Sequence, residues 1–358
     1  MRVTAIAAAA CLFAGGVLAA SAQPAKPAAP TGPQPAPAAA PIPVPRDVAY
    51  PGVMKVSVDA TDLAHHIFRV HETIPVSGGP VTLLYPEWLP GNHSPSGPIS
   101  MVAGLIVKAN GARLEWTRDP VHVFAFHVNA PKTARTLDVD FQFLSATEGS
   151  QGRIMMTPQM LSLQWNAVTL YPAGYFSRGI MTSPSVKFPQ GWKFASALEP
   201  ISTSGNTTTF KTVPFNTLVD SPMIAGRYFE RLDLDPNGPA PVHLDVIADR
   251  PDELAIKPEQ LAVHRALVQQ AYKLFGSHHY DHYDFLFSLS DKMGGNGLEH
   301  HRSSEDGTIP KYFMDWDASE ASRDLLSHEY THSWNGKFRR PADLWTPNFN
   351  VPMRDSLL

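Results

Sequence analysis

Cysteine is almost absent from this sequence, and its scarcity excludes whole classes of structure. Of 358 residues only Cys11 is a cysteine, and it lies inside an apolar stretch near the N-terminus. The rest of the chain therefore holds no disulfide and no thiolate metal ligand. An excess of charge of one sign is also lacking, because 29 Lys and Arg stand against 33 Asp and Glu, with no basic cluster or acidic tail. This balance predicts no nucleic-acid partner.

An apolar run long enough to span a membrane is missing as well. Residues 1–22 begin with the positive Arg2, continue through an Ala-rich apolar run and end in small residues. This pattern predicts a signal peptide cut after Ala22, and hence a secreted or periplasmic protein without a stable membrane span after cleavage. A membrane helix is the alternative, but the run is short and no charged stop follows it. A lipoprotein anchor is disfavoured because the apolar run continues past Cys11.

The next segment, residues 23–46, is dominated by proline and alanine. It contains 9 of the 34 prolines of the chain. Such a composition cannot build a packed core and favours extended polyproline conformations, so it predicts a linker between the export signal and the folded protein. A proline-rich ligand for a recognition domain is the alternative interpretation.

Residues 47–235 carry the patterns of β-strands. Alternation with a period of two appears in MKVSV (54–58), VHVFAFHV (121–128) and LDVDFQF (137–143). The pair Asn110-Gly111 suits a tight hairpin. These signals predict an N-terminal antiparallel β domain, most simply a sandwich.

Residues 236–358 have a different texture. A helix is predicted from Lys257 to Phe275, with an apolar face that includes Leu274 and a stop at Gly276. A strand over 283–290 leads into a glycine-rich loop, and a capping box at residues 317–320 precedes a second helix. The sequence therefore predicts an α+β multidomain protein, with an α/β domain following the β-sandwich.

The second helix carries the motif HEYTH. His328 and His332 are four residues apart and therefore lie on one helix face, where both imidazoles can bind one Zn²⁺ ion. Glu329 lies on an adjoining side, close enough to take a proton from a water molecule at the metal. The alternative is an ordinary surface helix that happens to carry two histidines.

Two further histidine-containing stretches come before this motif. In GGNGLEHHRSS (294–304), Glu299 projects from a predicted strand and would suit a substrate amine, although a simple glycine turn with an edge strand fits too. Neighbouring strand residues face opposite ways, so at most one of His300 and His301 can add a metal ligand. HHYDHY (278–283) is predicted to be a polar loop, with weak metal binding as its alternative.

Several separate stretches, in the right order, resemble the glycyl aminopeptidase family of zinc metallopeptidases, a gluzincin group related to the alanyl aminopeptidases. In the β half these are EWLPGNHS (87–94), WNAVTLYPAG (165–174) and LVDSPMIAGRYFE (218–230). In the second half they are FLFSLS (285–290), GGNGLEHHRSS and HEYTHSWNGKFRRP (328–341).

The resemblance implies a thermolysin-like catalytic domain over residues 236–358. It implies that His328 and His332 bind zinc, that Glu329 is the general base, and that Glu299, together with Gly297, binds the free amine of a peptide substrate. The implied activity is removal of small N-terminal residues such as glycine or alanine. The oligomeric state does not follow from the resemblance.

The third zinc ligand of that family is a glutamate on the next helix. RDSLL (354–358) resembles the start of that helix, so we expect the glutamate a few residues beyond Leu358 and the catalytic domain to be incomplete in this chain. Asp343 follows the preceding turn too closely to return to the metal, and Asp355 would be a poor substitute.

Two other functions stay open from the sequence. One is a binding or scaffold protein whose β domain recognises a peptide or glycan and whose HEYTH motif is vestigial. The other is an endopeptidase of the same zinc class, which would not need Glu299 to bind an amine.

Overall fold

The long alternating segments of the first half form strands as predicted. The computed structural model describes residues 40–354, except residues 90 and 93. MKVSV lies in β1 (Val53–Asp62) and LDVDFQF lies in β8 (Thr136–Leu144), each with alternate side chains buried. Asn110 and Gly111 connect β4 to β5 with positive φ angles of 51° and 78°, as the hairpin requires.

These strands belong to a nine-stranded sheet, which is antiparallel except for the parallel pair β1 and β11. Its order is β13 (Pro200–Ser204), β14 (Thr207–Phe210), β11 (Met181–Lys187), β1, β2 (Ile67–Pro75), β8, β4 (Val102–Ala109) and β5 (Ala112–Leu114), with β15 (Val213–Pro214) beside β11.

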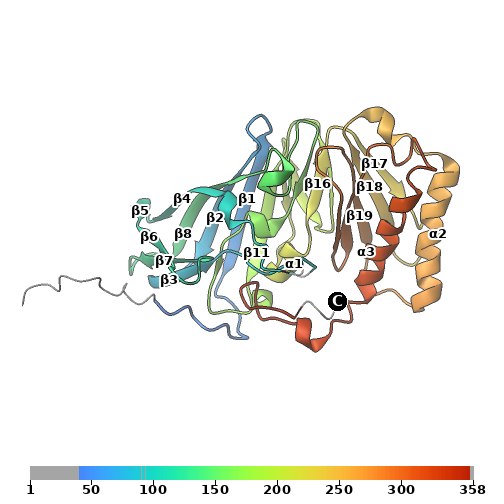
Figure 1. Cartoon of the computed structure of the whole chain (residues 1–358). Coiled ribbons are helices and arrows are strands. Elements are labelled where there is room, and N and C mark those ends of the chain that lie inside the picture. The colour runs from blue at the N-terminus through green and yellow to red at the C-terminus, as the bar shows by residue number, and fades with distance from the viewer. Residues whose placement is uncertain (1–39, 90, 93, 355–358) are drawn as a thin grey trace, which may run out of the picture. The chain divides into compact units, whose positions relative to one another are not determined.

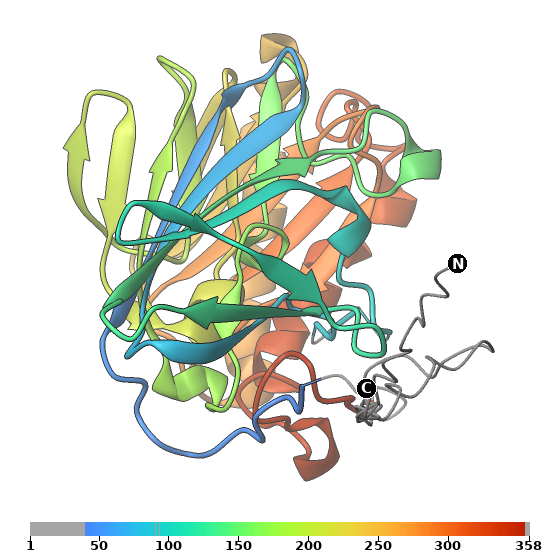
Figure 2. The ribbon, with the colours of Figure 1, turned by 90° about the vertical axis from the view of Figure 1, so that its left-hand side faces the viewer.

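Two smaller sheets complete the first half. One has the order β10 (Tyr171–Pro172), β3 (Gly79–Leu84), β7 (Ala125–Ala130) and β6 (Trp116–Arg118), and the other β12 (Lys193–Ser196), β16 (Met223–Gly226) and β9 (Met160–Leu163). The four-stranded sheet lies at the front in Figure 2. It shares one large apolar core with the nine-stranded sheet, to which Val56, Phe68, Leu83 and Phe126 contribute.

The strand predicted over 121–128 is correct only in its second half. Residues 121–124 are not a strand, because the Asp119 carboxylate accepts hydrogen bonds from the backbone N–H groups of Val121 and His122 (2.9 and 2.8 Å) and turns the chain there. β7 begins only at Ala125. An aspartate two residues before an alternating run is the signal that favours the turn.

The second half is built on a mixed five-stranded sheet. Its order is β17 (Phe229–Asp233), β18 (Val242–Ala248), β19 (Tyr283–Leu289), β21 (Ser303–Thr308) and β20 (Asn296–Glu299). The inner pairs β18/β19 and β19/β21 are parallel, and β20 is antiparallel to β21. The strand predicted over 283–290 is thereby confirmed, and β20 lies at the edge of the sheet.

Each face of this sheet has its own cover. Helices α2 (Pro258–Phe275) and α3 (Asp324–Trp334) cover one face, where Phe285 and Phe287 pack in a core with Tyr330. On the other face Leu286 packs in a core with Met160 of the three-stranded sheet. Figure 1 shows α3 between α2 and the sheet strands. The fold is therefore α+β, with a β-sheet half followed by a helix-covered mixed sheet.

Two details of the predicted helices are wrong. Leu274 is 75% exposed rather than buried, although α2 itself ends at Gly276 as expected. The capping box at 317–320 does not form: Glu320–Ser322 is a 3-10 turn, and α3 begins at Asp324. The Arg323 guanidinium carbon lies 4.2 Å from the centre of the Trp316 ring, next to the start of this helix.

Some predictions lie outside the described residues. These are the signal peptide (1–22), most of the linker (23–46) and Asp355. The described end of the linker is bonded to the β half, because Arg46 donates its N–H to the Gly174 carbonyl (3.1 Å).

The division of the chain into two domains between residues 235 and 236 stays a prediction. No helix in the described part of the chain combines the length and apolar character of a membrane span. The short helix α1 (Phe215–Val219) belongs to the first half.

Candidate metal centre

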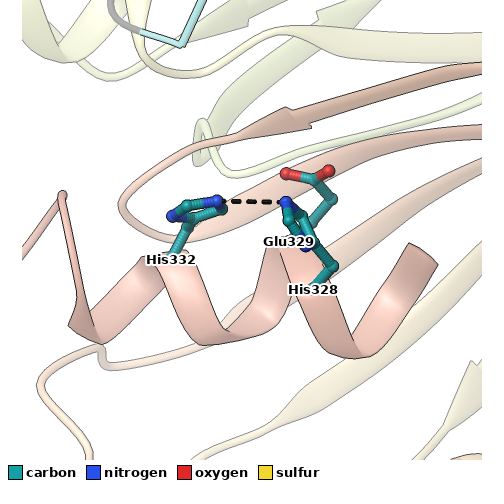
Figure 3. Close-up of side chains that lie close together, drawn as sticks. All are labelled: His328, Glu329 and His332. Atoms are coloured by element: carbon teal, nitrogen blue, oxygen red, sulfur yellow. Dashed lines mark hydrogen bonds between the residues drawn. The ribbon is translucent and has the colours of Figure 1, made fainter. Parts of the chain in front are cut away.

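Helix α3 presents the HEYTH motif beside the five-stranded sheet. Leu326, Tyr330 and Ser333 are buried and lie on one face at helical spacing. The Tyr330 ring packs 4.7 Å from the Tyr283 ring. This packing sets the rotation of the helix, so that His328 and His332 lie on its more exposed flank. Figure 3 shows both imidazoles and the Glu329 carboxylate on α3.

The two imidazoles are arranged so that both could bind one metal ion. Their Nε2 atoms are 3.2 Å apart, and the ring planes are inclined by 78°. His332 donates its Nδ1–H to the Asn335 carbonyl (3.1 Å), which leaves the Nε2 lone pair directed at His328. A backbone carbonyl therefore selects the tautomer that a metal needs.

The geometry fits zinc. Two nitrogens that each lie about 2.0–2.1 Å from a tetrahedral zinc ion are separated by about 3.3 Å. The Nε2 atoms of His328 and His332 already have nearly this separation. Within the described residues, His328, Glu329 and His332 are the one group of potential ligands close enough to hold an ion, with ligand atoms within 4.8 Å of one another.

Glu329 is the buried member of this group, with 5% of its surface exposed. Burial, and after it the negative charge of Glu299, raise its pKa to about 7, against the opposite influence of His300 and Lys337. A carboxyl group with this pKa exchanges its proton near neutral pH, which is what a general base and acid requires.

Gly297 of β20 is placed directly against Glu329. A Cβ atom at this position would lie 2.2 Å from Glu329 Oε1 and 2.9 Å from Leu325 Cδ1. A side chain there would displace the carboxylate or the helix, so the absence of a side chain at Gly297 determines how closely Glu329 approaches the edge strand.

The buried charge of Glu329 predicts a pH-dependent cost to the metal-free protein. The folded pKa of about 7 exceeds the unfolded value of 4.5, so the folded state binds the proton more tightly. The contribution of this protonation to the free energy of unfolding is fully present below pH 4.5 and is lost as the pH rises through 7. Glu329→Gln, which is neutral throughout, should exceed the wild type by about 3 kcal/mol at pH 8 and by almost nothing at pH 4.5.

Urea unfolding in the presence of a chelator measures this difference. Glu320→Gln is the matched control, because Glu320 is an exposed residue in the turn that precedes α3. If Glu329→Gln raised the free energy of unfolding equally at both pH values, burial of the charged Glu329 carboxylate would not destabilise the protein.

Glu299 lies close to Glu329 but is held by a different part of the chain. It is 5% exposed, at the end of β20. Gly91, in a loop of the first half, approaches so closely that a Cβ there would lie 2.5 Å from Glu299 Oε2. Gly91 has a φ of 92°, in the region that favours glycine. No local pattern around Gly91 indicates this role, because the contact joins residues more than two hundred positions apart.

His300 and His301 do not join the metal group. His300 faces the other side of β20, where Nδ1 lies 3.3 Å from Asp220 Oδ1 and Nε2 lies 3.4 Å from Glu305 Oε2. Burial disfavours its charged form, but these two carboxylates raise its pKa. His301 packs edge-on against the His279 ring, 5.1 Å away. Both histidines lie beyond the end of β20, which was predicted to contain them, and neither is part of the metal group.

The remaining candidate ligands lie elsewhere. Asp343 Oδ2 is 3.9 Å from the Arg354 guanidinium and is not part of the metal group. In the stretch 278–283, His279 bonds to Ser333 Oγ (3.0 Å) and stacks on Phe338, so it packs against α3 instead of binding a metal with its neighbours. His282 bonds to Asp284 (2.8 Å).

An open cavity of about 810 Å³ adjoins the motif. The glycine-rich segment 294–297 lines one side, and Leu325, His328 and Glu329 line the other. The cavity therefore runs between the edge strand and α3, directly past the carboxylate and one of the two imidazoles.

A helix that carries two imidazoles and a buried carboxylate at this spacing, next to the edge strand of a mixed sheet, defines an HExxH metallopeptidase fold. The chain belongs to the M61 peptidase family. The model described as Peptidase M61 N-terminal domain matches residues 55–227, and the model described as M61 glycyl aminopeptidase matches residues 321–358.

Several solved structures are similar to this chain at low sequence identity, and the first of those described here shares its fold. An aminopeptidase N family protein from Idiomarina loihiensis is 20% identical, with a TM-score of 0.67, over 80% of this chain and 48% of that chain. Leukotriene A4 hydrolase from Saccharomyces cerevisiae is 14% identical, with a TM-score of 0.47, over 81% and 44%. An M1 zinc metallopeptidase from Deinococcus radiodurans is 14% identical, with a TM-score of 0.44, over 81% and 64%.

The chain spans about half the length of the first of these structures. No curated protein sequence matches the chain.

Proposed function

We propose that the protein is a zinc aminopeptidase that removes small N-terminal residues, glycine or alanine, from peptides. The observation that carries this proposal is the pair of imidazoles with Nε2 atoms 3.2 Å apart, beside a carboxyl group whose pKa lies near 7. Membership of the M61 family supports it.

His328 and His332 would hold the zinc ion through Nε2. Bound there, zinc lowers the pKa of a water ligand and polarises the carbonyl of the substrate. A catalytic zinc site has three protein ligands, and we propose that the third is a glutamate that follows Leu358. Tests of activity therefore use the extended protein, which we define as this chain together with the residues that follow Leu358 in its gene.

Glu329 performs the proton transfers. One carboxylate oxygen takes a proton from the attacking water, and the same group then gives that proton to the leaving amine. Its burial and its proximity to Glu299 keep the pKa near the working pH, so both directions of transfer are accessible. Gly297 leaves the space in which the carboxylate can reach the substrate.

Glu299 would bind the free amine of the substrate. An ammonium group placed between Glu299 and the metal centre neutralises a buried carboxylate, and charge-assisted hydrogen bonds of this kind are strong. β20 is the edge strand of the five-stranded sheet, and a cavity of about 810 Å³ adjoins it. A peptide could bind in this cavity along the edge of the sheet.

The amine assignment predicts a selective defect in Glu299→Ala. The extended protein with this change should hydrolyse an alanyl amide with a kcat/KM about 10- to 100-fold below that of the wild type, because a hydrogen bond to a charged group is lost. Hydrolysis of the N-acetylated peptide analogue, measured in the same assay, should change little. Glu320→Ala serves as the exposed control. A similar loss on both substrates would argue for an endopeptidase in which Glu299 has only a structural role.

We further propose that residues 1–22 direct export, so that the enzyme acts in the periplasm or outside the cell. The charged start, the apolar run and the small residues before position 23 support this.

A further inference from the structure

Asp220 connects the two halves of the chain next to the proposed amine site. It directly follows helix α1 of the first half, and its carboxylate accepts three hydrogen bonds from the second half. The donors are the His301 backbone N–H (2.8 Å), Lys337 Nζ (3.1 Å) and His300 Nδ1 (3.3 Å). No step of the proposed reaction uses this carboxylate, although it lies beside the strand that carries Glu299.

The charges around Asp220 strengthen these bonds. Only 6% of the Lys337 side chain is exposed, and the His300 side chain is exposed to the same extent. Burial alone would raise the pKa of Asp220, but Lys337, His300 and the His301 N–H outweigh burial and hold this pKa well below its usual range. Asp220 is therefore charged at neutral pH, and hydrogen bonds to a charged acceptor are stronger than those between neutral groups.

Two of the three donors belong to the turn that follows Glu299. β20 ends at Glu299, and residues 300–302 lead into β21, with a hydrogen bond from the His300 N–H to the Ser303 carbonyl (3.0 Å). β20 has only four residues and pairs with β21 at the edge of the sheet. An edge strand has a neighbour on one side only. Asp220 therefore supports the end of β20 from outside the sheet.

The same carboxylate is connected to helix α3 by two routes. In the first, Lys337 donates its backbone N–H to the His332 carbonyl (3.2 Å). In the second, Ser333 Oγ donates to the carbonyl of His301 (2.9 Å). Asp220 accepts bonds from both Lys337 and His301, so it holds the end of β20 and the C-terminal end of α3 in a fixed relation.

We propose that Asp220 is a positioning residue that sets the distance between the Glu299 carboxylate and the metal-binding imidazoles. That distance determines which peptide bond of a substrate reaches the metal when the substrate amine is bound at Glu299. This inference rests on the proposed aminopeptidase function and deepens it, because it assigns to the first half a part in selecting the bond that is cut. A displacement of about 1 Å at the reacting groups can lower a rate about 100-fold, so Asp220 can control turnover without touching the substrate.

Asp220→Asn in the extended protein removes the charge and keeps the size of the side chain. It should lower kcat for an alanyl amide about 10-fold with a smaller change in KM, because the amine still binds while the carbonyl to be attacked is displaced from the metal. Hydrolysis of the N-acetylated peptide analogue, which does not depend on Glu299, should change by less than about 3-fold. Asp47→Asn is the matched control, because Asp47 forms an exposed ion pair with Arg178, and both rates should stay at the wild-type level.

A double-mutant cycle separates positioning from a general structural role. If Asp220 acts through Glu299, then Asp220→Asn should change the alanyl amide rate by less than about 2-fold in a protein that already carries Glu299→Ala. A structural role would give the same loss in both backgrounds and on both substrates. Equal losses of that kind, or a wild-type rate for Asp220→Asn, would overturn the proposal.

Hydrogen exchange on the chain ending at Leu358 tests the positioning without any substrate. Asp220→Asn should raise the exchange rate of the His301 amide about 10-fold, because its charged acceptor is lost. The amide of Leu244 in the inner strand β18 should exchange at the wild-type rate, which shows that the fold is intact. An unchanged exchange rate at His301 would contradict the positioning role, whatever the activity of the extended protein.

Two further outcomes are distinguishable. If Glu299→Ala alone leaves the alanyl amide rate unchanged while exchange at His301 responds to Asp220→Asn, the proposed amine site fails and Asp220 still holds the end of β20. If Asp220→Asn does not fold, Lys337→Gln takes its place, since it removes a charge from the same bonds but keeps a donor. It should give the same pattern with smaller changes, and equal losses on the free and acetylated substrates would again overturn the proposal.

Discussion

Replacing Glu329 by glutamine in the extended protein is expected to lower kcat for alanyl amide hydrolysis by about 10²- to 10⁴-fold. Glutamine keeps the shape of the side chain against Gly297 but can neither take nor give the proton. The zinc content should stay at the wild-type level, because the two imidazoles are untouched. Kinetics and elemental analysis on the same preparation measure both quantities.

Glu320→Gln is again the control, since Glu320 is exposed in the 3-10 turn before α3. If Glu329→Gln kept more than half of the wild-type kcat, Glu329 would not be the general base. A loss of activity accompanied by loss of zinc would point instead to a ligand role for Glu329.

The second large effect is expected on zinc affinity. His328→Asn and His332→Asn each remove one of the two Nε2 atoms proposed to bind zinc. Loss of a residue that only hydrogen-bonds to a metal ligand weakens metal binding ~10- to 100-fold, so each of these substitutions should weaken zinc binding by more than that. Competition against a chromophoric chelator gives the dissociation constants in the extended protein.

His301→Asn is the matched control for this series. His301 packs against the His279 ring and is not part of the metal group. The His301→Asn protein should therefore bind zinc with the affinity of the wild type. If His301→Asn weakened zinc binding as much as His332→Asn, the metal would lie elsewhere than between His328 and His332.

Sequence periodicity was enough to place the two proposed metal ligands on one helix face. Residues four apart meet on any helix, so the pairing of His328 and His332 needs no tertiary information. The start of α3 was harder to predict, because residues 317–320 fit the capping-box pattern, whereas Glu320–Ser322 forms a 3-10 turn and α3 begins only at Asp324. Leu274 likewise fits the apolar pattern of α2 but is exposed in the folded protein.

The surroundings of the motif could not be predicted because they join distant parts of the chain. Gly91 lies against Glu299, and Asn166 lines a cavity of about 440 Å³ together with Leu298 of β20, yet neither residue has a periodic or spacing signal that connects it to α3. The stretches that contain them, EWLPGNHS and WNAVTLYPAG, were informative only through resemblance. Their physical role became visible once the fold placed both against the edge strand.

The pKa of Glu329 illustrates the same division. The sequence indicates a carboxylate next to a metal ligand, but not its burial or the presence of Glu299 nearby. Burial and a second negative charge are properties of the assembled sheet and helix, and they raise the pKa to about 7. Those two properties make the group useful for proton transfer near neutral pH.

Anomalous X-ray scattering at the zinc edge, from crystals of the extended protein, would locate the ion between the two imidazoles. We expect a peak about 2.0–2.1 Å from Nε2 of both His328 and His332. The absence of a peak between these two imidazoles in crystals grown with zinc would contradict it.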